Sequence, residues 1–206
     1  CSNMREAACA VIAEALATLD VESRPGIDIV AIDPRGVRLS SGEDIAAETV
    51  IWCGGMRAHP LAASLPGRHD RFGRVAVDRF MRVEEAPDIF ATGDAAVALL
   101  DGERESVMSC QHARPMGRIA GHNVVCDLVG APMIPLEIGY YATCLDLGAW
   151  GAVYTQGWDR QITATGATAK ETKRTINCVR IYPPRSRDAA EILAAAAPVV
   201  QAPPRR

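Results

Sequence analysis

The sequence lacks several patterns that assign a protein to a common functional class. Its 206 residues contain no CxxC pair, no HxH or HExxH spacing and no GxGxxG glycine fingerprint. The first two absences argue against a zinc site, so no metal is expected. The third means that these residues do not hold a dinucleotide pyrophosphate by themselves. No apolar run is long enough to cross a bilayer. A net charge of −3 gives no basic field for nucleic acid.

Cysteine is present, but not in a pattern that indicates disulfides. The seven cysteines are an odd number, and a reducing cytoplasm fits them best. The chain begins at Cys1 with an immediate helical pattern, without an initiator methionine or a signal peptide. We therefore expect a fragment of a longer cytoplasmic protein; peripheral contact with the inner face of the cell membrane stays open.

The N-terminal third predicts a helix and a β-meander. Apolar residues recur at three-and-four spacing after Ser2, which is a suitable cap, and predict a helix ending near Asp20. Alternating segments at 27–32 and 37–39 are separated by turn residues and predict meander strands. The continuous apolar run 49–53, which ends at Gly54 and Gly55, predicts a strand buried on both faces.

The remainder predicts short strands, two helices and an antiparallel sheet. Short strands are expected at 75–78 and 89–91, and a helix at 115–128 with Pro115 early in it. Three antiparallel strands are expected at 138–145, 150–155 and 160–164. A helix at 168–178 should expose Lys170, Lys173 and Arg174, and the tail beyond Pro184 should be partly mobile. Four cysteines lie in apolar patterns and are expected in the core: Cys53, Cys126, Cys144 and Cys178.

The segment 89–96, IFATGDAA, places an aspartate directly after a strand and a glycine. Gly93 would let a chain of hydroxyls and phosphates approach the backbone, and the Asp94 carboxylate could then accept a sugar or ribityl hydroxyl. Asp94 could equally cap a helix. The segment alone does not separate these two interpretations.

Three blocks carry a resemblance to a known family. They are residues 44–60 (DIAAETVIWCGGMRAHP), residues 73–96 with the IFATGDAA segment, and residues 109–113 (SCQHA) followed by Gly117, Gly121 and Asn123. In their order along the chain these blocks resemble the pyridine-nucleotide and flavin dependent oxidoreductases, and most closely the type II NADH dehydrogenases. The second block is the most specific of the three.

The resemblance implies an α/β fold, part of a flavoprotein with two Rossmann-like dinucleotide-binding domains and a small antiparallel C-terminal sheet plus helix. It divides the chain into the end of the NAD(P)H domain (1–48), the C-terminal part of the FAD domain (49–130), an α+β segment (131–184) and a tail (185–206). It also implies an enzyme that passes electrons from NAD(P)H through FAD to a quinone or other acceptor. The alternative is a non-catalytic interaction or assembly module derived from half of a flavoprotein. A homodimer stays open.

The resemblance also implies a set of cofactor-binding residues, although it assigns no catalytic residue. Gly93, Asp94 and Ala95 would contact the ribityl-phosphate part of FAD, and backbone groups of Cys110, Gln111 and His112 would approach the pyrimidine side of the flavin. Gly54 and Gly55 belong to the segment that returns to the FAD domain. Helix-terminal N–H groups near residues 114–117 would favour negative charge on the reduced flavin.

Some residues depart from the family pattern or allow two interpretations. Pro115 stands where many type II dehydrogenases carry a second glutamine towards the quinone, which leaves the acceptor open. Cys110 is either a reactive thiol beside His112 or a small buried residue lining the flavin. Four aromatic residues offer a quinone platform or ordinary packing: Trp150, Trp158, Tyr140 and Tyr141.

Overall fold

A computed structural model describes residues 4–200 of the chain. The first elements are helix α1 (Glu6–Thr18) and a three-stranded antiparallel meander, β1 (Ile29–Asp33), β2 (Gly36–Leu39) and β3 (Asp44–Ala46). Both the helix and the meander confirm the sequence prediction. The apolar stripe of α1 buries Ala8, Ile12 and Ala15. The expected cap Ser2 lies outside the described residues.

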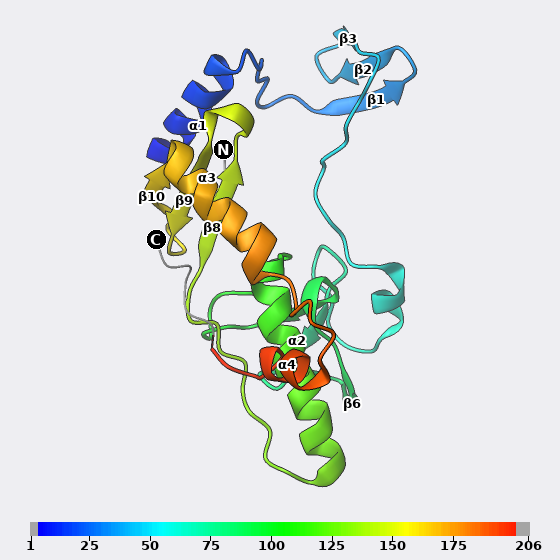
Figure 1. Cartoon of the computed structure of the whole chain (residues 1–206). Coiled ribbons are helices and arrows are strands. Elements are labelled where there is room, and N and C mark those ends of the chain that lie inside the picture. Colours follow the sequence, from blue (N-terminus) through cyan, green and yellow to red (C-terminus); the bar gives the residue numbers. More distant parts are fainter. Residues whose placement is uncertain (1–3, 201–206) are drawn as a thin grey trace.

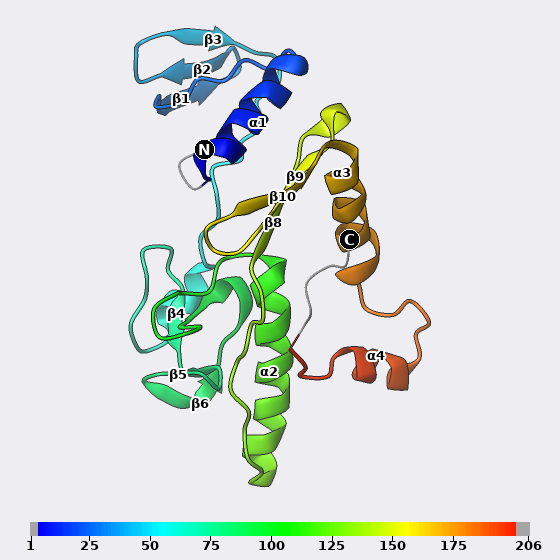
Figure 2. The same cartoon turned by 90° about the vertical axis from the view of Figure 1, so that its left-hand side faces the viewer.

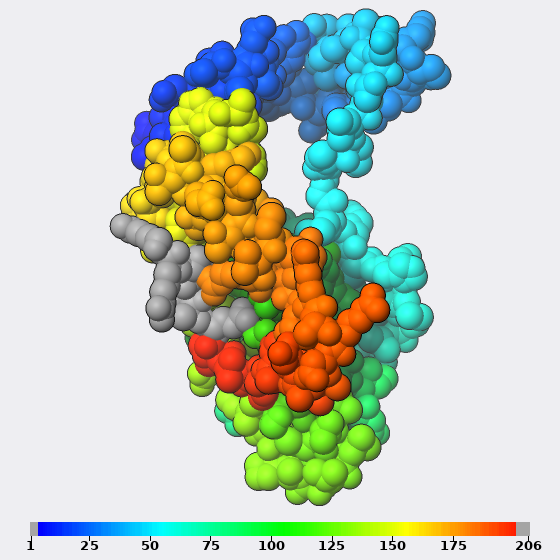
Figure 3. Space-filling view, in the orientation of Figure 1, coloured from blue at the N-terminus to red at the C-terminus, as the bar shows by residue number. Residues whose placement is uncertain are grey.

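The chain between β3 and the next element, the short 3-10 helix η1 (Pro60–Ser64), is extended and exposed. The buried strand predicted at 49–53 is absent there, and the side chains of Ile51 and Trp52 are 81% and 65% exposed. This prediction is wrong for a physical reason: a strand buried on both faces needs neighbours for its hydrogen bonds and two covering layers. The rest of residues 4–200 supplies neither, and the space-filling view shows an open space beside this connection (Figure 3).

The central unit is a four-stranded sheet covered by the longest helix. The strands are β4 (Val75–Val77), β5 (Arg82–Val83), β6 (Ala86–Phe90) and β7 (Ala96–Ala98), in the order β6-β5-β4-β7, with β4 and β7 parallel. Helix α2 (Cys110–Val129) lies along this unit (Figure 2). It packs Met116, Ile119 and Ala120 into the core that the strands form. The parallel pair and its covering helix are the α/β part of the fold.

Helix α2 begins at Cys110, so the predicted start at Pro115 is wrong. Ser109 is the residue before the helix, in an extended conformation. Pro115 lies in the second turn and is buried, and its missing N–H leaves the Gln111 carbonyl without its usual helical donor. The expected helix-terminal N–H groups near residues 114–117 are therefore interior to the helix, and the terminal ones belong to Cys110 and Gln111.

The C-terminal unit confirms the three predicted antiparallel strands. They are β8 (Ala142–Asp146), β9 (Ala152–Gln156) and β10 (Gln161–Thr165), with a 3-10 turn η3 (Gly148–Trp150) between the first two. Helix α3 (Gly166–Thr175) covers one face through Ala152 and Tyr154. Helix α1 covers the other through Val153, as the alternation of a strand requires. The domain division stays a prediction. Helix α1, at the N-terminal end of the described residues, nevertheless packs on this C-terminal sheet (Figure 1).

Several local predictions about the C-terminal half need correction. Lys170 and Lys173 are half-buried rather than exposed: Lys170 pairs with Asp146 at 2.7 Å, and the Lys173 Nζ donates to the Cys144 carbonyl at 2.9 Å. A π-helix, η4 (Ile176–Arg180), continues α3, and helix α4 (Ala189–Ala195) forms within the tail.

Two of the four cysteines expected in the core are exposed. Cys126 is buried and Cys144 is half-buried, whereas Cys53 and Cys178 face solvent. Cys53 lies in the extended connection, and Cys178 lies in η4, where neighbouring elements cover only one side. No helix within residues 4–200 is long and apolar enough to cross a membrane.

Candidate functional site

The segment after β6 makes a tight turn against the first turns of α2. Residues Gly93–Ala95 form a single 3-10 turn, η2, and β7 follows at once. The helix that Asp94 could have capped is therefore limited to this one turn. Gly93 has φ +65°, and a Cβ placed on it would touch the Ala113 Cβ at 3.5 Å. That contact is an ordinary van der Waals distance, so glycine is favoured here by its backbone conformation rather than by lack of space.

Asp94 is half-buried in this turn and has no protein partner. Its Oδ1 atom is buried without a hydrogen bond, and the cap of η2 is Thr92. The helix-capping interpretation of Asp94 is therefore wrong. A buried carboxylate oxygen without a donor is costly, so an outside hydroxyl or N–H would complete the site.

The start of α2 offers further unpaired polar groups beside this turn. Ser109 makes no side-chain cap, and its Oγ atom is buried without a partner. The Ser109 carbonyl accepts from the N–H groups of His112 and Ala113, which leaves the N–H groups of Cys110 and Gln111 for an outside acceptor. The Cys110 side chain is exposed, so the described protein residues do not bury it. Its place beside the flavin stays a prediction.

The Gln111 side chain is occupied by the protein. Its amide forms two hydrogen bonds with the Ala142 backbone: Nε2 donates to the carbonyl at 3.1 Å, and Oε1 accepts from the N–H at 2.8 Å. This pair joins the start of α2 to the start of β8. Only the backbone of Gln111 is left for a cofactor, as the resemblance implied.

His112 is buried and points into the protein. Its Nδ1 accepts from the Val107 N–H at 2.8 Å, which places the ring proton on Nε2 in the neutral form. Burial, and secondarily the Arg74 guanidinium, lower the pKa of His112 to about 4. Its ring packs on Tyr141 and Trp158, which stack on each other with centroids 4.2 Å apart. These two aromatic rings therefore pack on each other and on His112, and a role towards a quinone stays a prediction.

Gly54 and Gly55 lie in the extended connection, both exposed. That segment joins the meander to the central unit (Figure 1). The structure therefore gathers Gly93, Asp94, Ala95 and the start of α2, and leaves these two glycines outside the group.

A pocket of about 410 Å³ opens at the start of α2, between the C-terminal sheet and η4. Its apolar lining includes Tyr140, Met108 and Ile176, and Cys110 also lines the pocket. Four cationic side chains also line it: Arg114, Arg160, Lys173 and Arg180. Sequence reasoning missed these cations because they come from separate elements. A π-helix, which often marks a functional site, was the available structural signal.

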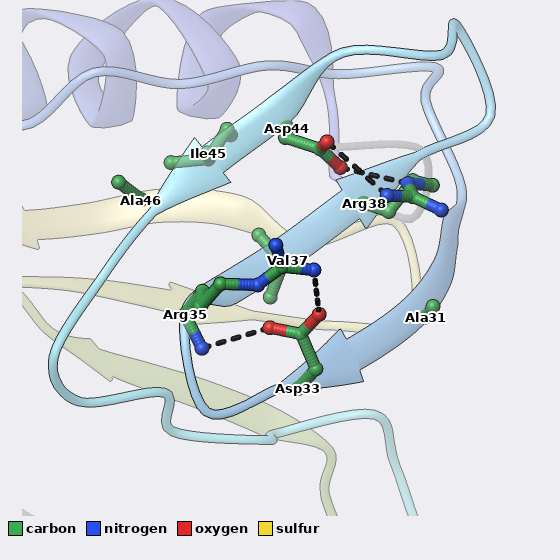
Figure 4. A pocket seen from close by; sticks show the side chains of 9 residues that line it. Ala31, Asp33, Arg35, Val37, Arg38, Asp44, Ile45 and Ala46 are labelled. Carbon is green, nitrogen blue, oxygen red and sulfur yellow. Dashed lines mark hydrogen bonds and ion pairs between the residues drawn. The ribbon is translucent and has the colours of Figure 1, made fainter.

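A second hollow, of about 190 Å³, lies on the meander (Figure 4). Its charged side chains pair with each other: Asp33 with Arg35 at 3.0 Å and Arg38 with Asp44 at 2.8 Å. It therefore presents no unbalanced charge to a ligand. Among residues 4–200, no group of three His, Cys, Asp or Glu side chains is placed to hold a metal ion.

The fold defines the class first: a parallel strand pair under a long helix, with an antiparallel C-terminal sheet, is part of a Rossmann-like α/β architecture. A structure of an FAD-dependent pyridine nucleotide-disulphide oxidoreductase from Desulfovibrio vulgaris is similar to it, with a TM-score of 0.57 and 23% identity over 75% of this chain and 39% of that chain. The family model for pyridine nucleotide-disulphide oxidoreductases matches residues 1–117. The chain belongs to this family.

Curated relatives indicate which members of this family the chain is similar to. The chain is 54% identical over 200 residues to an NADH dehydrogenase-like protein of Mycobacterium tuberculosis, covering 97% of this chain and 50% of the relative. It is 27% identical over 128 residues to a demethylphylloquinone reductase of Synechocystis, covering 61% of this chain and 32% of that protein. The chain thus spans about half the length of the curated relatives it matches. The resemblance to NADH dehydrogenases is confirmed.

FAD is the cofactor that the family indicates, and the residues present fit one side of it. The unpartnered Asp94 Oδ1, the buried Ser109 Oγ and the free N–H groups at the start of α2 form a set of polar atoms that lack protein partners. They would meet the hydroxyls and the pyrimidine edge of FAD.

Proposed function

We propose that this chain is the acceptor-side part of an NAD(P)H dehydrogenase, in which electrons pass from NAD(P)H through FAD to a quinone or related acceptor. The observation that carries the proposal is the buried Asp94 Oδ1 without a partner, in a glycine turn against the start of α2. The names of the two curated relatives support the donor and the quinone class. Bound FAD would supply the chemistry, accepting a hydride and releasing electrons.

The residues of this chain would bind and orient the cofactor. Asp94 would accept a hydrogen bond from a ribityl hydroxyl, and Gly93 would allow that close approach. The N–H groups of Cys110 and Gln111, at the positive end of a 20-residue helix, would favour negative charge at the adjacent edge of the ring. Gln111 would keep this helix end fixed by its two bonds to Ala142.

The pocket at the start of α2 would receive the electron acceptor. Cys110 and Gln111 belong both to its wall and to the proposed flavin contacts, so an acceptor there would lie beside the cofactor. Tyr140 presents an aromatic ring to the pocket, and burial raises the pKa of its phenol. The ring would thus stay uncharged beside a flat acceptor.

The experiment uses the complete dehydrogenase of which we propose this chain is a part: its bound flavin is reduced anaerobically by NADH and by NADPH, and turnover with a soluble quinone follows. Bleaching of the flavin absorbance and quinone-dependent NAD(P)H oxidation are expected. A protein that carries no flavin, or flavin that neither nucleotide reduces, contradicts the proposal. The absence of flavin would instead favour the non-catalytic module, which the missing glycine fingerprints motivate.

A further inference from the structure

The charges around the α2 pocket differ from those of the whole chain. The chain carries a net charge of −3. The pocket wall, by contrast, contains Arg114, Arg160, Lys173 and Arg180 and no Asp or Glu among the described residues. Asp159, next to Arg160 in the sequence, is paired with Arg5, and Asp146, two residues from Cys144, is paired with Lys170; none of these four residues lines the pocket.

Three of these cations have no carboxylate partner within residues 4–200. The Lys173 Nζ donates to the neutral Cys144 carbonyl. The Arg160 guanidinium donates to the Tyr141 hydroxyl at 3.0 Å and contacts the Met4 sulfur at 3.5 Å. Arg114 forms no ion pair with any residue that the structure describes.

Arg114 also lies one helical turn from another cation. Arg118 follows it at i+4 on α2, and like charges at this spacing repel. Burial, and secondarily the charge of Arg114, lower the pKa of the Arg118 guanidinium. Arg118 itself donates to the Ala195 carbonyl, which does not neutralise it. An anion in the pocket would relieve this repulsion.

The remaining wall is suited to a flat apolar ring. Met108, Ile176, Ile181 and the rings of Tyr140 and Tyr154 line the pocket. Its volume of about 410 Å³ lies within the roughly 300–1,000 Å³ typical of sites for small organic ligands. Apolar walls with a few convergent cations bind a ring that carries an anionic group.

We propose that the α2 pocket selects an aromatic acceptor that carries a carboxylate, of the naphthoquinone-carboxylate class, over an uncharged quinone. That the ligand is an electron acceptor rests on the proposed function. The preference for a carboxylate rests on Arg114, Lys173 and Arg160 alone. Arg114 and Lys173 lie on different helices, α2 and α3, and would contact the carboxylate from two sides.

The test is calorimetric titration of the flavin-loaded protein with naphthoate and with its uncharged isostere naphthamide, neither of which needs turnover. We expect naphthoate to bind about tenfold more tightly, which corresponds to about 1.4 kcal/mol, because charge-assisted hydrogen bonds are stronger than neutral ones. Arg114→Gln and Lys173→Gln should each reduce that preference about fivefold or more, with naphthamide binding unchanged. Arg174→Gln is the matched control, because it removes an exposed cation of α3 outside the pocket.

Equal binding of the two probes overturns the inference, as does a preference that survives both pocket variants or that Arg174→Gln reduces equally. A thermal melt of each variant identifies loss of folding, and the conservative Arg114→Lys should then retain the preference. Turnover separates this inference from the proposed function: flavin that NAD(P)H does not reduce refutes the function, whereas the naphthoate titration still decides the charge preference.

Discussion

At the scale of single residues, the candidate site is defined by polar atoms without partners. Asp94 Oδ1 and Ser109 Oγ are both buried and unbonded, although buried polar atoms are almost always hydrogen-bonded in folded proteins. They come from two segments that η2 and α2 bring together. Neighbouring side chains whose donors and acceptors are used, such as Gln111, have positioning roles instead.

Replacing Asp94 with alanine should weaken FAD binding about ten- to a hundredfold, because a hydrogen bond to a charged group contributes about 1.5–3 kcal/mol. Flavin fluorescence titration of the apoprotein measures this. Asp88→Ala is the matched control, since Asp88 is an exposed aspartate of the preceding strand. Equal FAD affinity in wild type and Asp94→Ala would contradict the assignment of Asp94.

His112 predicts a dependence of stability on pH. Burial holds its pKa at about 4 in the folded protein, below its usual value of about 6.5 in the unfolded chain. Both states are neutral above that value. As the pH falls below it, the unfolded state binds the proton first and stability is lost. The loss amounts to about 2 kcal/mol between pH 7 and pH 5.

Denaturant unfolding of wild type and His112→Gln at pH 7 and pH 5 tests this. The glutamine variant cannot titrate at this position, so its stability should fall less over the interval by about 2 kcal/mol. Equal pH slopes for the two proteins would show that His112 is not held neutral by the fold.

At the scale of secondary-structure elements, the junctions between units depend on a few backbone contacts. Gln111 joins α2 to β8. Gly151 joins the start of β9 to the start of α3, where a Cβ on it would lie 2.4 Å from the Gly166 carbonyl carbon. The Gln111 bonds hold the start of β8 against the start of α2, and the Gly151 contact holds the start of α3 against β9.

Gly151→Ala should lower the free energy of unfolding by about 3 kcal/mol or more, because the methyl group meets backbone that cannot move aside and φ is +124°. Gly148→Ala, in the same connection, is the control: φ is +59° and no atom lies within 4 Å of the added Cβ. Its expected cost is about 1 kcal/mol. Chemical denaturation compares the two, and similar losses would show that the close approach is not required.

Gln111→Ala should remove both hydrogen bonds to Ala142 and lower the free energy of unfolding by about 1–3 kcal/mol. The backbone N–H of residue 111 remains, so the folded variant should still bind FAD. Unfolding curves and flavin titration together check this. Loss of FAD binding in the folded variant would instead assign the Gln111 side chain to the cofactor.

At the scale of the whole molecule, local sequence patterns predicted the helices and strands. They did not predict which residues are buried by contacts between distant segments of the chain. The meander, the three C-terminal strands and the long helix follow from alternation and turn residues, and the family blocks located Gly93 and Asp94. The prediction of a buried strand at 49–53 failed because an apolar run indicates burial but does not identify the segments that would cover it. The cationic pocket stayed hidden because Arg114, Arg160 and Lys173 meet only through tertiary contacts.

The most direct measurement of the central claim uses the complete dehydrogenase of which we propose this chain is a part: its visible spectrum is recorded before and after anaerobic addition of NADH or NADPH. The account predicts a flavin absorbance in the oxidised protein that either nucleotide bleaches, and release of FAD on denaturation. A colourless protein that releases no flavin, and binds none when FAD is added, would contradict it.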